Sequence, residues 1–198
     1  IGASALDANT TRHNNTAIGY RALTSQSVAD QNTAIGADCM FSNTEGEYNV
    51  GLGFMALYNN TTADQNTGVG YQALLANTTG QYNVAVGSGS LDANTTANAN
   101  TAVGYASLSA NTTGSQNTAV GYATMQNTTT GNHNTGFGAL ALQNTTTGAG
   151  NTALGDSSLR NNTSASNNTA VGKDALNANT TGTENTAVGA EALDASTT

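Results

Sequence analysis

The sequence has little of what most soluble globular domains contain. Charged residues make up 8% of its 198 residues and aromatic residues 5%, and proline and tryptophan are absent. A typical soluble domain carries roughly 25% charged residues. The single cysteine, Cys39, excludes an intrachain disulfide framework. Four lysines and arginines against twelve acidic residues exclude the basic surface of a nucleic-acid-binding protein or of a polybasic membrane anchor.

Long apolar runs are missing as well. No stretch approaches the roughly 18 consecutive apolar residues of a transmembrane helix, so we expect no membrane insertion. Asn, Thr, Gly and Ala dominate instead. Such a composition alone would suit disorder, because few large apolar side chains are available to offset the entropy of ordering the chain. A strict internal repeat argues against disorder.

The chain repeats every 17 residues without insertion or deletion. We number the positions of the repeat from 1 to 17, starting at an asparagine that recurs in every repeat. Position 5 is always glycine, position 4 always apolar, position 9 always Leu or Met, and positions 3 and 8 are small. Residues 1–198 therefore form one repeat domain, with a truncated first repeat over 1–14 and further repeats starting at 15, 32, 49, 66, 83, 100, 117, 134, 151, 168 and 185.

The repeat unit favours short strands over helices. Its glycines, asparagines and β-branched residues would penalise a helix in every repeat. In the NTAVG segment, alternate residues face opposite sides of an extended chain. We predict an all-β fold: a parallel β-solenoid, or β-roll, of about twelve 17-residue coils, with a second short strand in each coil over positions 7 to 10. Coils spaced at about 4.8 Å would rise roughly 50 to 55 Å.

Each predicted strand carries apolar residues on both faces. We expect the large side chains of positions 4 and 9 to fill the interior of the coil. The small apolar residues of positions 3 and 8 would then lie outside this interior, and a second surface would have to cover them to exclude water. This arrangement predicts that parallel copies of the chain pack against one another through their alanines.

Two sets of side chains are candidate functional or structural sites. The asparagines of position 1 are mostly followed by Thr-Ala, which is no glycosylation sequon, and they are predicted to stack as a structural amide ladder. The ladder consists of Asn15, Asn32, Asn49, Asn66, Asn83, Asn100, Asn117, Asn134, Asn151, Asn168 and Asn185. True sequons, such as those at Asn77 and Asn111, fall in the return loop, where a glycosylating host could modify them. Tyrosine recurs at position 6, and either covers the adjacent glycine turn or forms a surface for recognition, through Tyr20, Tyr71, Tyr105 and Tyr122.

The remaining polar residues indicate no chemistry. His13 and His133 lie in different repeats and at different positions, which disfavours a shared metal or catalytic site. The paired threonines of positions 13 and 14 would point to opposite sides of an extended segment, so turn hydroxyls are favoured over an ice-binding face. Acidic residues such as Asp30 and Asp64 are expected to be scattered surface charge. We predict no enzyme activity, no cofactor and no metal site.

The NTAIG unit of Asn32–Gly36 and the NVAVG unit of Asn83–Gly87 resemble the strand motif of trimeric autotransporter adhesin heads. The longer units of Asn66–Gly80 and Asn100–Gly114 are similar to repeats of phage tail fibres and bacterial surface proteins. The resemblance implies a left-handed β-roll, a homotrimer, and a place in a virion tail fibre or on a bacterial cell surface. The coils here are longer than those of most adhesin heads.

These observations predict a structural fibre segment that spaces or presents a receptor-binding tip. One alternative is a module that binds a host-surface glycan or protein directly through its exposed rows. Another is a self-assembling extracellular filament. Nucleic acid is not an expected partner.

Overall fold

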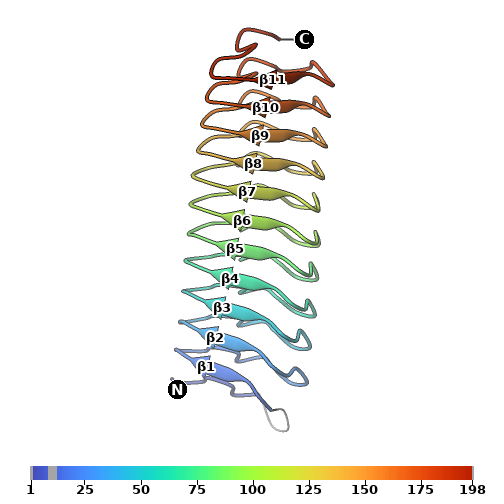
Figure 1. The fold of residues 1–198 in the computed structure, drawn as a ribbon. Coiled ribbons are helices and arrows are strands. Elements are labelled where there is room, and N and C mark those ends of the chain that lie inside the picture. The colour runs from blue at the N-terminus through green and yellow to red at the C-terminus, as the bar shows by residue number, and fades with distance from the viewer. Residues whose placement is uncertain (1, 9–12, 198) are drawn as a thin grey trace.

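The computed structural model describes residues 2–8 and 13–197 and shows one stack of coils with the two termini at opposite ends (Figure 1). One strand of three residues lies in each coil, and the eleven strands pair in parallel in the order of the sequence. The predicted all-β parallel solenoid is confirmed. Its strands are β1 (Thr16–Ile18), β2 (Thr33–Ile35), β3 (Val50–Leu52), β4 (Thr67–Val69), β5 (Val84–Val86), β6 (Thr101–Val103), β7 (Thr118–Val120), β8 (Thr135–Phe137), β9 (Thr152–Leu154), β10 (Thr169–Val171) and β11 (Thr186–Val188).

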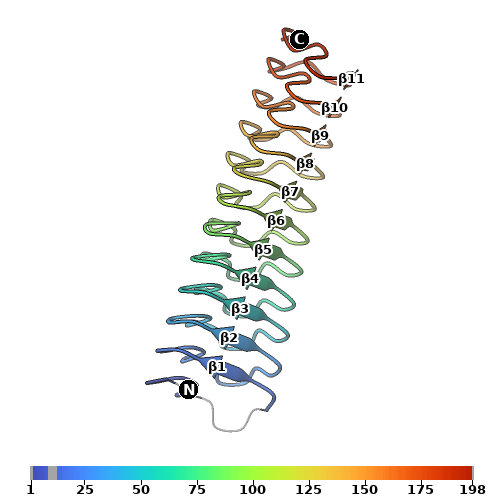
Figure 2. The same ribbon diagram turned by 60° about the vertical axis from the view of Figure 1, so that its left-hand side comes forward.

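The 17-residue period fixes the register of the sheet. Ala17 pairs with Ala34, and every later strand pairs in the same way with the residue one repeat further on. Equal positions therefore stack along one side of the molecule (Figure 2). At about 4.8 Å per strand, eleven strands rise about 48 Å. The described residues form no helix, and they therefore contain no helix that could cross a membrane.

The glycine of position 5 ends each strand because no other residue fits there. Gly104 has a φ of +131°, and a Cβ built on it would lie 2.2 Å from the carbonyl oxygen of Gly121 in the next coil. From Gly19 to Gly172, the glycines of position 5 have the same backbone conformation and meet the same obstacle. The backbones of successive coils thus approach each other at a corner where a methyl group would collide.

The predicted second strand over positions 7 to 10 is wrong. Residues at positions 7 and 9 have left-handed backbone angles, with φ of 56° at Met55 and 54° at Leu57, whereas strands need strongly negative φ. Coils still bond to one another here, because the Met55 N–H donates to the Ala37 carbonyl at 3.1 Å and the Leu57 N–H donates to the Ala73 carbonyl at 2.9 Å. These bonds and the burial of Leu57 offset a conformational cost of about 1–2 kcal/mol per left-handed residue.

The predicted assignment of the interior is confirmed for position 9, which is buried in the core, but it is wrong for positions 3, 4 and 8. The middle residue of every strand, at position 3, is buried, while positions 2 and 4 face outward. Ala34 is fully buried with the side chains of positions 8 and 9, represented by Cys39 and Met40. The leucine or methionine of position 9 fills the interior from the wall opposite the strand, which leaves room there only for a methyl group. The alanines therefore form the core and no interchain surface.

Glycine replaces alanine at position 3 in three coils, and at two of these sites the neighbouring core residues are larger than usual. A Cβ on Gly51 would lie 2.5 Å from Sγ of Cys39, and a Cβ on Gly136 would lie 2.9 Å from Cγ2 of Thr124. In both cases position 8 of the preceding coil is larger than the usual alanine, and position 9 is a methionine. Substitutions between repeats therefore compensate one another through space, as expected of a close-packed interior.

Candidate functional surfaces

The position-1 asparagines lie inside the stack and join successive coils. From Asn32 to Asn168 they are fully buried, and Asn15 and Asn185 are half-buried. Each Oδ1 accepts a hydrogen bond from the backbone N–H of the asparagine in the next coil at 2.9–3.0 Å. Each Nδ2 from Asn15 to Asn168 donates to the carbonyl of position 15 in its own coil. The contacts thus run mainly from side chain to backbone, and longer amide-to-amide bonds of 3.1–3.3 Å join five of the pairs.

A second asparagine column, which we did not predict, occupies position 12. Here the bonds run from amide to amide, as from Asn60 Nδ2 to Asn43 Oδ1 and from Asn94 Nδ2 to Asn77 Oδ1, both at 2.8 Å. The recurrence of asparagine before the threonine pair was its signal in the sequence. The sequon asparagines Asn77 and Asn111 belong to this column and are fully buried, so the folded chain cannot present them for glycosylation.

The position-12 column is interrupted in the middle of the stack. Thr128 and Thr145 replace asparagine there, and both are buried. As a result, Asn111 Oδ1 and Thr128 Oγ1 are buried without a hydrogen-bond partner in the described chain. Toward the preceding coil, Asn162 Nδ2 makes a long bond of 3.4 Å to Thr145 Oγ1, besides its bond of 3.0 Å to the Ala165 carbonyl in its own coil. The ladder is therefore weakest between Asn111 and Asn162.

Two further columns stabilise the return loop. Thr78 Oγ1 donates to the carbonyl of Thr95 at 3.0 Å, and the other position-13 threonines do the same to the next coil. At position 16 the side chain instead accepts from the preceding coil, as when the Glu47 N–H donates to Asp64 Oδ1 at 2.7 Å. Asn98, Ser115 and Asn132 act in the same way at position 16, because each side chain offers a short acceptor. Acidic residues such as Asp64 thus link neighbouring coils through hydrogen bonds. They were expected only to be scattered surface charge.

The outer sheet face, formed by the side chains of positions 2 and 4, carries no charge. Every one of the 16 charged residues of the chain lies outside positions 1 to 5. Position 2 presents threonine or valine, and position 4 presents a row of Val, Ile, Leu and Phe, several of them exposed. Leu52 is 44% exposed and Phe137 42%. The outer sheet face therefore combines a continuous apolar row with an absence of charged side chains, on a chain with a net charge of −8.

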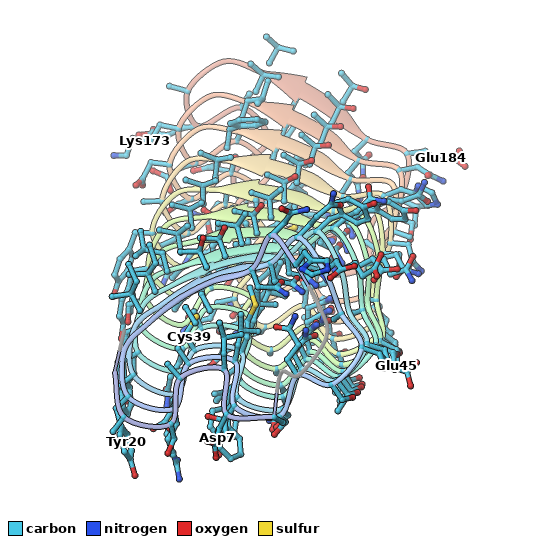
Figure 3. The ribbon with its side chains drawn as sticks, turned by 90° about the horizontal axis from the view of Figure 1, so that it is seen from below. Asp7, Tyr20, Cys39, Glu45, Lys173 and Glu184 are labelled. Carbon is cyan, nitrogen blue, oxygen red and sulfur yellow. The ribbon has the colours of Figure 1, made fainter. Side chains whose placement is uncertain are left out.

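The tyrosines of position 6 lie on a different side of the coil. Seen along the stack, Tyr20 at position 6 and Asp7 at position 10 extend from one side, while Cys39 lies inside (Figure 3). Tyr20, Tyr71, Tyr105 and Tyr122 are all more than half exposed, and Tyr105 and Tyr122 stack with centroids 5.5 Å apart. The structure therefore places these four side chains in one solvent-exposed column.

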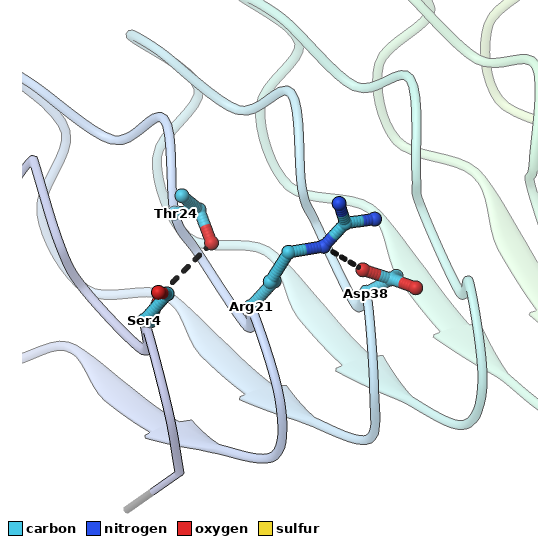
Figure 4. A network of polar contacts seen from close by, with 4 residues as sticks. All are labelled: Ser4, Arg21, Thr24 and Asp38. Carbon is cyan, nitrogen blue, oxygen red and sulfur yellow. Dashed lines mark hydrogen bonds and ion pairs between the residues drawn. The ribbon is translucent and has the colours of Figure 1, made fainter.

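Arg21 is the one cation among these aromatic residues. Its Nε donates to Asp38 Oδ1 at 2.6 Å, and Thr24 beside it donates to the Ser4 carbonyl (Figure 4). The hydrogen bond to the Asp38 carboxylate raises the pKa of the Arg21 guanidinium. The guanidinium carbon also lies 5.3 Å from the ring centroid of Tyr20 in a cation–π contact.

Burial shifts the pKa values of two further groups, the buried Cys39 and the partly buried Asp92. Burial raises the pKa of the Cys39 thiol to about 12, and a backbone hydrogen bond at Ile35 opposes this only partly. Burial also raises the pKa of Asp92, whose Oδ1 has no hydrogen-bond partner in the described chain. Over residues 2–8 and 13–197, no pocket forms and no three His, Cys, Asp or Glu gather to hold a metal ion.

The fold defines the chain as a parallel β-solenoid repeat protein. No family model, curated protein or solved structure matches it.

Proposed function

We propose that the chain is a rigid structural segment of a fibre, in a phage tail fibre or on a bacterial cell surface, where it spaces or presents a receptor-binding tip. The bonding between coils supports a mechanical role. Backbone bonds and the columns of positions 1, 12, 13 and 16 join each coil to the next, so a coil cannot open without breaking several bonds. The chain forms a continuous rod whose length depends only on the number of repeats.

The fibre is a parallel homotrimer whose copies meet through their outer sheet faces. The absence of charge from this face carries the proposal, because copies that each carry a net charge of −8 repel one another least where no charge is present. Parallel copies in register would place equal rows of Val and Ile side by side. The likeness of the NTAIG and NVAVG units to adhesin heads favours three copies.

A lysine in the middle of the outer sheet face tests this arrangement. Val103 lies at position 4 of β6 and points outward, so Val103→Lys leaves the core of the coil intact. At the centre of an apolar seam the charge would be buried without a partner, and the trimer is expected to dissociate to folded monomers. Thr113→Lys, on the exposed return loop, is the matched control and should keep the mass of the unaltered chain. A Val103→Lys variant with that same mass would show that this face is no seam.

A further inference from the structure

The aromatic column of position 6 is interrupted twice in the same way. Phe54 and Tyr71 occupy adjacent coils and stack with centroids 5.8 Å apart, and Tyr105 stacks on Tyr122 at 5.5 Å. Small residues occur in two coils between aromatic neighbours. They produce two notches: one over Ala37, between Tyr20 and Phe54, and one over Ser88, between Tyr71 and Tyr105.

Along the stack, each notch has the length that one additional aromatic ring would occupy. Its two walls are two coils apart, which corresponds to about 9.6 Å along the stack. A ring placed between them would lie about 4.8 Å from each wall, within the 4.5–7 Å range of stacked rings. All the wall rings except Phe54, which is 42% exposed, are more than half exposed, so the notches are open to solvent along the side of the rod.

Polar groups lie close to both notches. The Arg21 guanidinium lies over the Tyr20 ring and over the Phe41 ring, with its carbon 5.3 Å and 4.6 Å from the two centroids, and it is ion-paired with the buried Asp38, the residue after Ala37. The second notch has the Ser88 hydroxyl at its floor and Gln72 directly after the Tyr71 wall. Apolar walls with a rim of hydroxyl, amide and guanidinium groups match a pyranose ring, which has apolar C–H faces and hydroxyls around its edge.

We propose that the two notches are binding sites for the pyranose rings of a neutral glycan that lies along the rod. Three coils separate Ala37 from Ser88, so the sites are about 14 Å apart on one side, and a single oligosaccharide can occupy both. The net charge of −8 disfavours an anionic glycan. Two linked sites also give an avidity that neither shallow notch has alone. The notches lie at position 6, away from the outer sheet face, so they do not depend on trimer formation.

Affinity gel electrophoresis with neutral hexose polysaccharides tests this assignment. Dextran, galactomannan and hydroxyethyl cellulose are cast separately into native gels, and the mobility of the chain is compared with that in a plain gel. We expect at least one of them to retard the unaltered chain. The double variant Ala37→Tyr, Ser88→Tyr completes the aromatic stack and blocks both notches, so its apparent affinity should fall at least tenfold. Ala139→Tyr adds the same ring at position 6 between Tyr122 and Asp156, where no notch exists, and should bind as the unaltered chain does.

Removal of a wall provides a second, independent variant. Tyr20→Ala together with Tyr105→Ala opens both notches and should also weaken retardation at least tenfold, whereas Tyr122→Ala, in the same column, should not. Circular dichroism spectra that match the unaltered chain confirm that each variant is folded. Failure of all three polysaccharides to retard the unaltered chain would overturn the proposal, and so would equal retardation of the blocked variant. Binding of N-acetyltryptophanamide without binding of any polysaccharide would assign the notches to a protein side chain instead.

Discussion

Repair of the interrupted position-12 column should stabilise the protein. In Thr128→Asn, the new Nδ2 can donate to Asn111 Oδ1 and to the Gly131 carbonyl, in the geometry that Asn77 adopts toward Asn60 and Gly80. The substitution gives Asn111 Oδ1 a donor and removes Thr128 Oγ1, and both of these buried atoms now lack partners. Each unsatisfied buried group costs about 1–3 kcal/mol, so we expect a gain of about 2 kcal/mol in the free energy of unfolding. Asn and Thr are similar in size, so little new strain enters the core.

Urea denaturation followed by circular dichroism measures this gain. The midpoint should rise at an unchanged slope with denaturant, because the surface exposed on unfolding stays the same. Thr130→Asn makes the same chemical change two residues away on the exposed position 14 and should change the free energy of unfolding by less than about 0.5 kcal/mol. A Thr128→Asn variant no more stable than the Thr130→Asn control would refute the view that the amide column stabilises the stack.

Three further predictions concern single residues. Gly104→Ala should destabilise the chain by more than about 3 kcal/mol or prevent folding, since its Cβ collides with a backbone carbonyl. Gly89→Ala, whose Cβ would meet only Asp92 Oδ2 at 3.9 Å, should cost no more than a left-handed alanine does at its φ of +64°, about 1–2 kcal/mol; similar thermal midpoints for the two variants would contradict the collision. Iodoacetamide at pH 8 should leave Cys39 unmodified until urea unfolds the chain, because its thiol is buried and its pKa is about 12; labelling of the folded chain would count against this burial. Since burial raises the folded-state pKa of Asp92 above its unfolded value, its charge weakens the fold at neutral pH, and the penalty disappears as the pH falls through the folded pKa. Asp92→Asn should therefore raise the urea midpoint at pH 7 by an amount that shrinks in acid, and a difference that is the same at both pH values would contradict the assignment.

The architecture could be predicted from the sequence because one period controls it. An uninterrupted 17-residue repeat with a fixed glycine allows only a stack of equal coils, and the pairing of β1 with β2 follows from that spacing. The direction of the strand side chains could not be predicted in the same way. Ala34 and Ile35 are adjacent and both apolar, so alternation along the strand does not say which of them faces inward. Ala34 faces inward because Met40, on the opposite wall of the narrow coil, leaves space only for a small side chain.

The backbone at positions 7 and 9 could not be predicted from residue preferences. Leucine rarely adopts left-handed angles, yet Leu57, Leu74 and their equivalents do so throughout the stack. The burial of each leucine and its bond to the next coil outweigh the local preference, and both appear only once coils stack. The columns of positions 12 and 16 were overlooked for a related reason. Their asparagines and aspartates read as loop residues until the loops of successive coils lie one above another.

The molar mass of the purified chain in solution, measured by light scattering, tests the proposed fibre most directly. The account predicts a mass near three times 19.8 kDa, held together through the uncharged outer sheet face. A well-folded species of 19.8 kDa would contradict it and leave a single solenoid with its Val and Ile rows exposed to water.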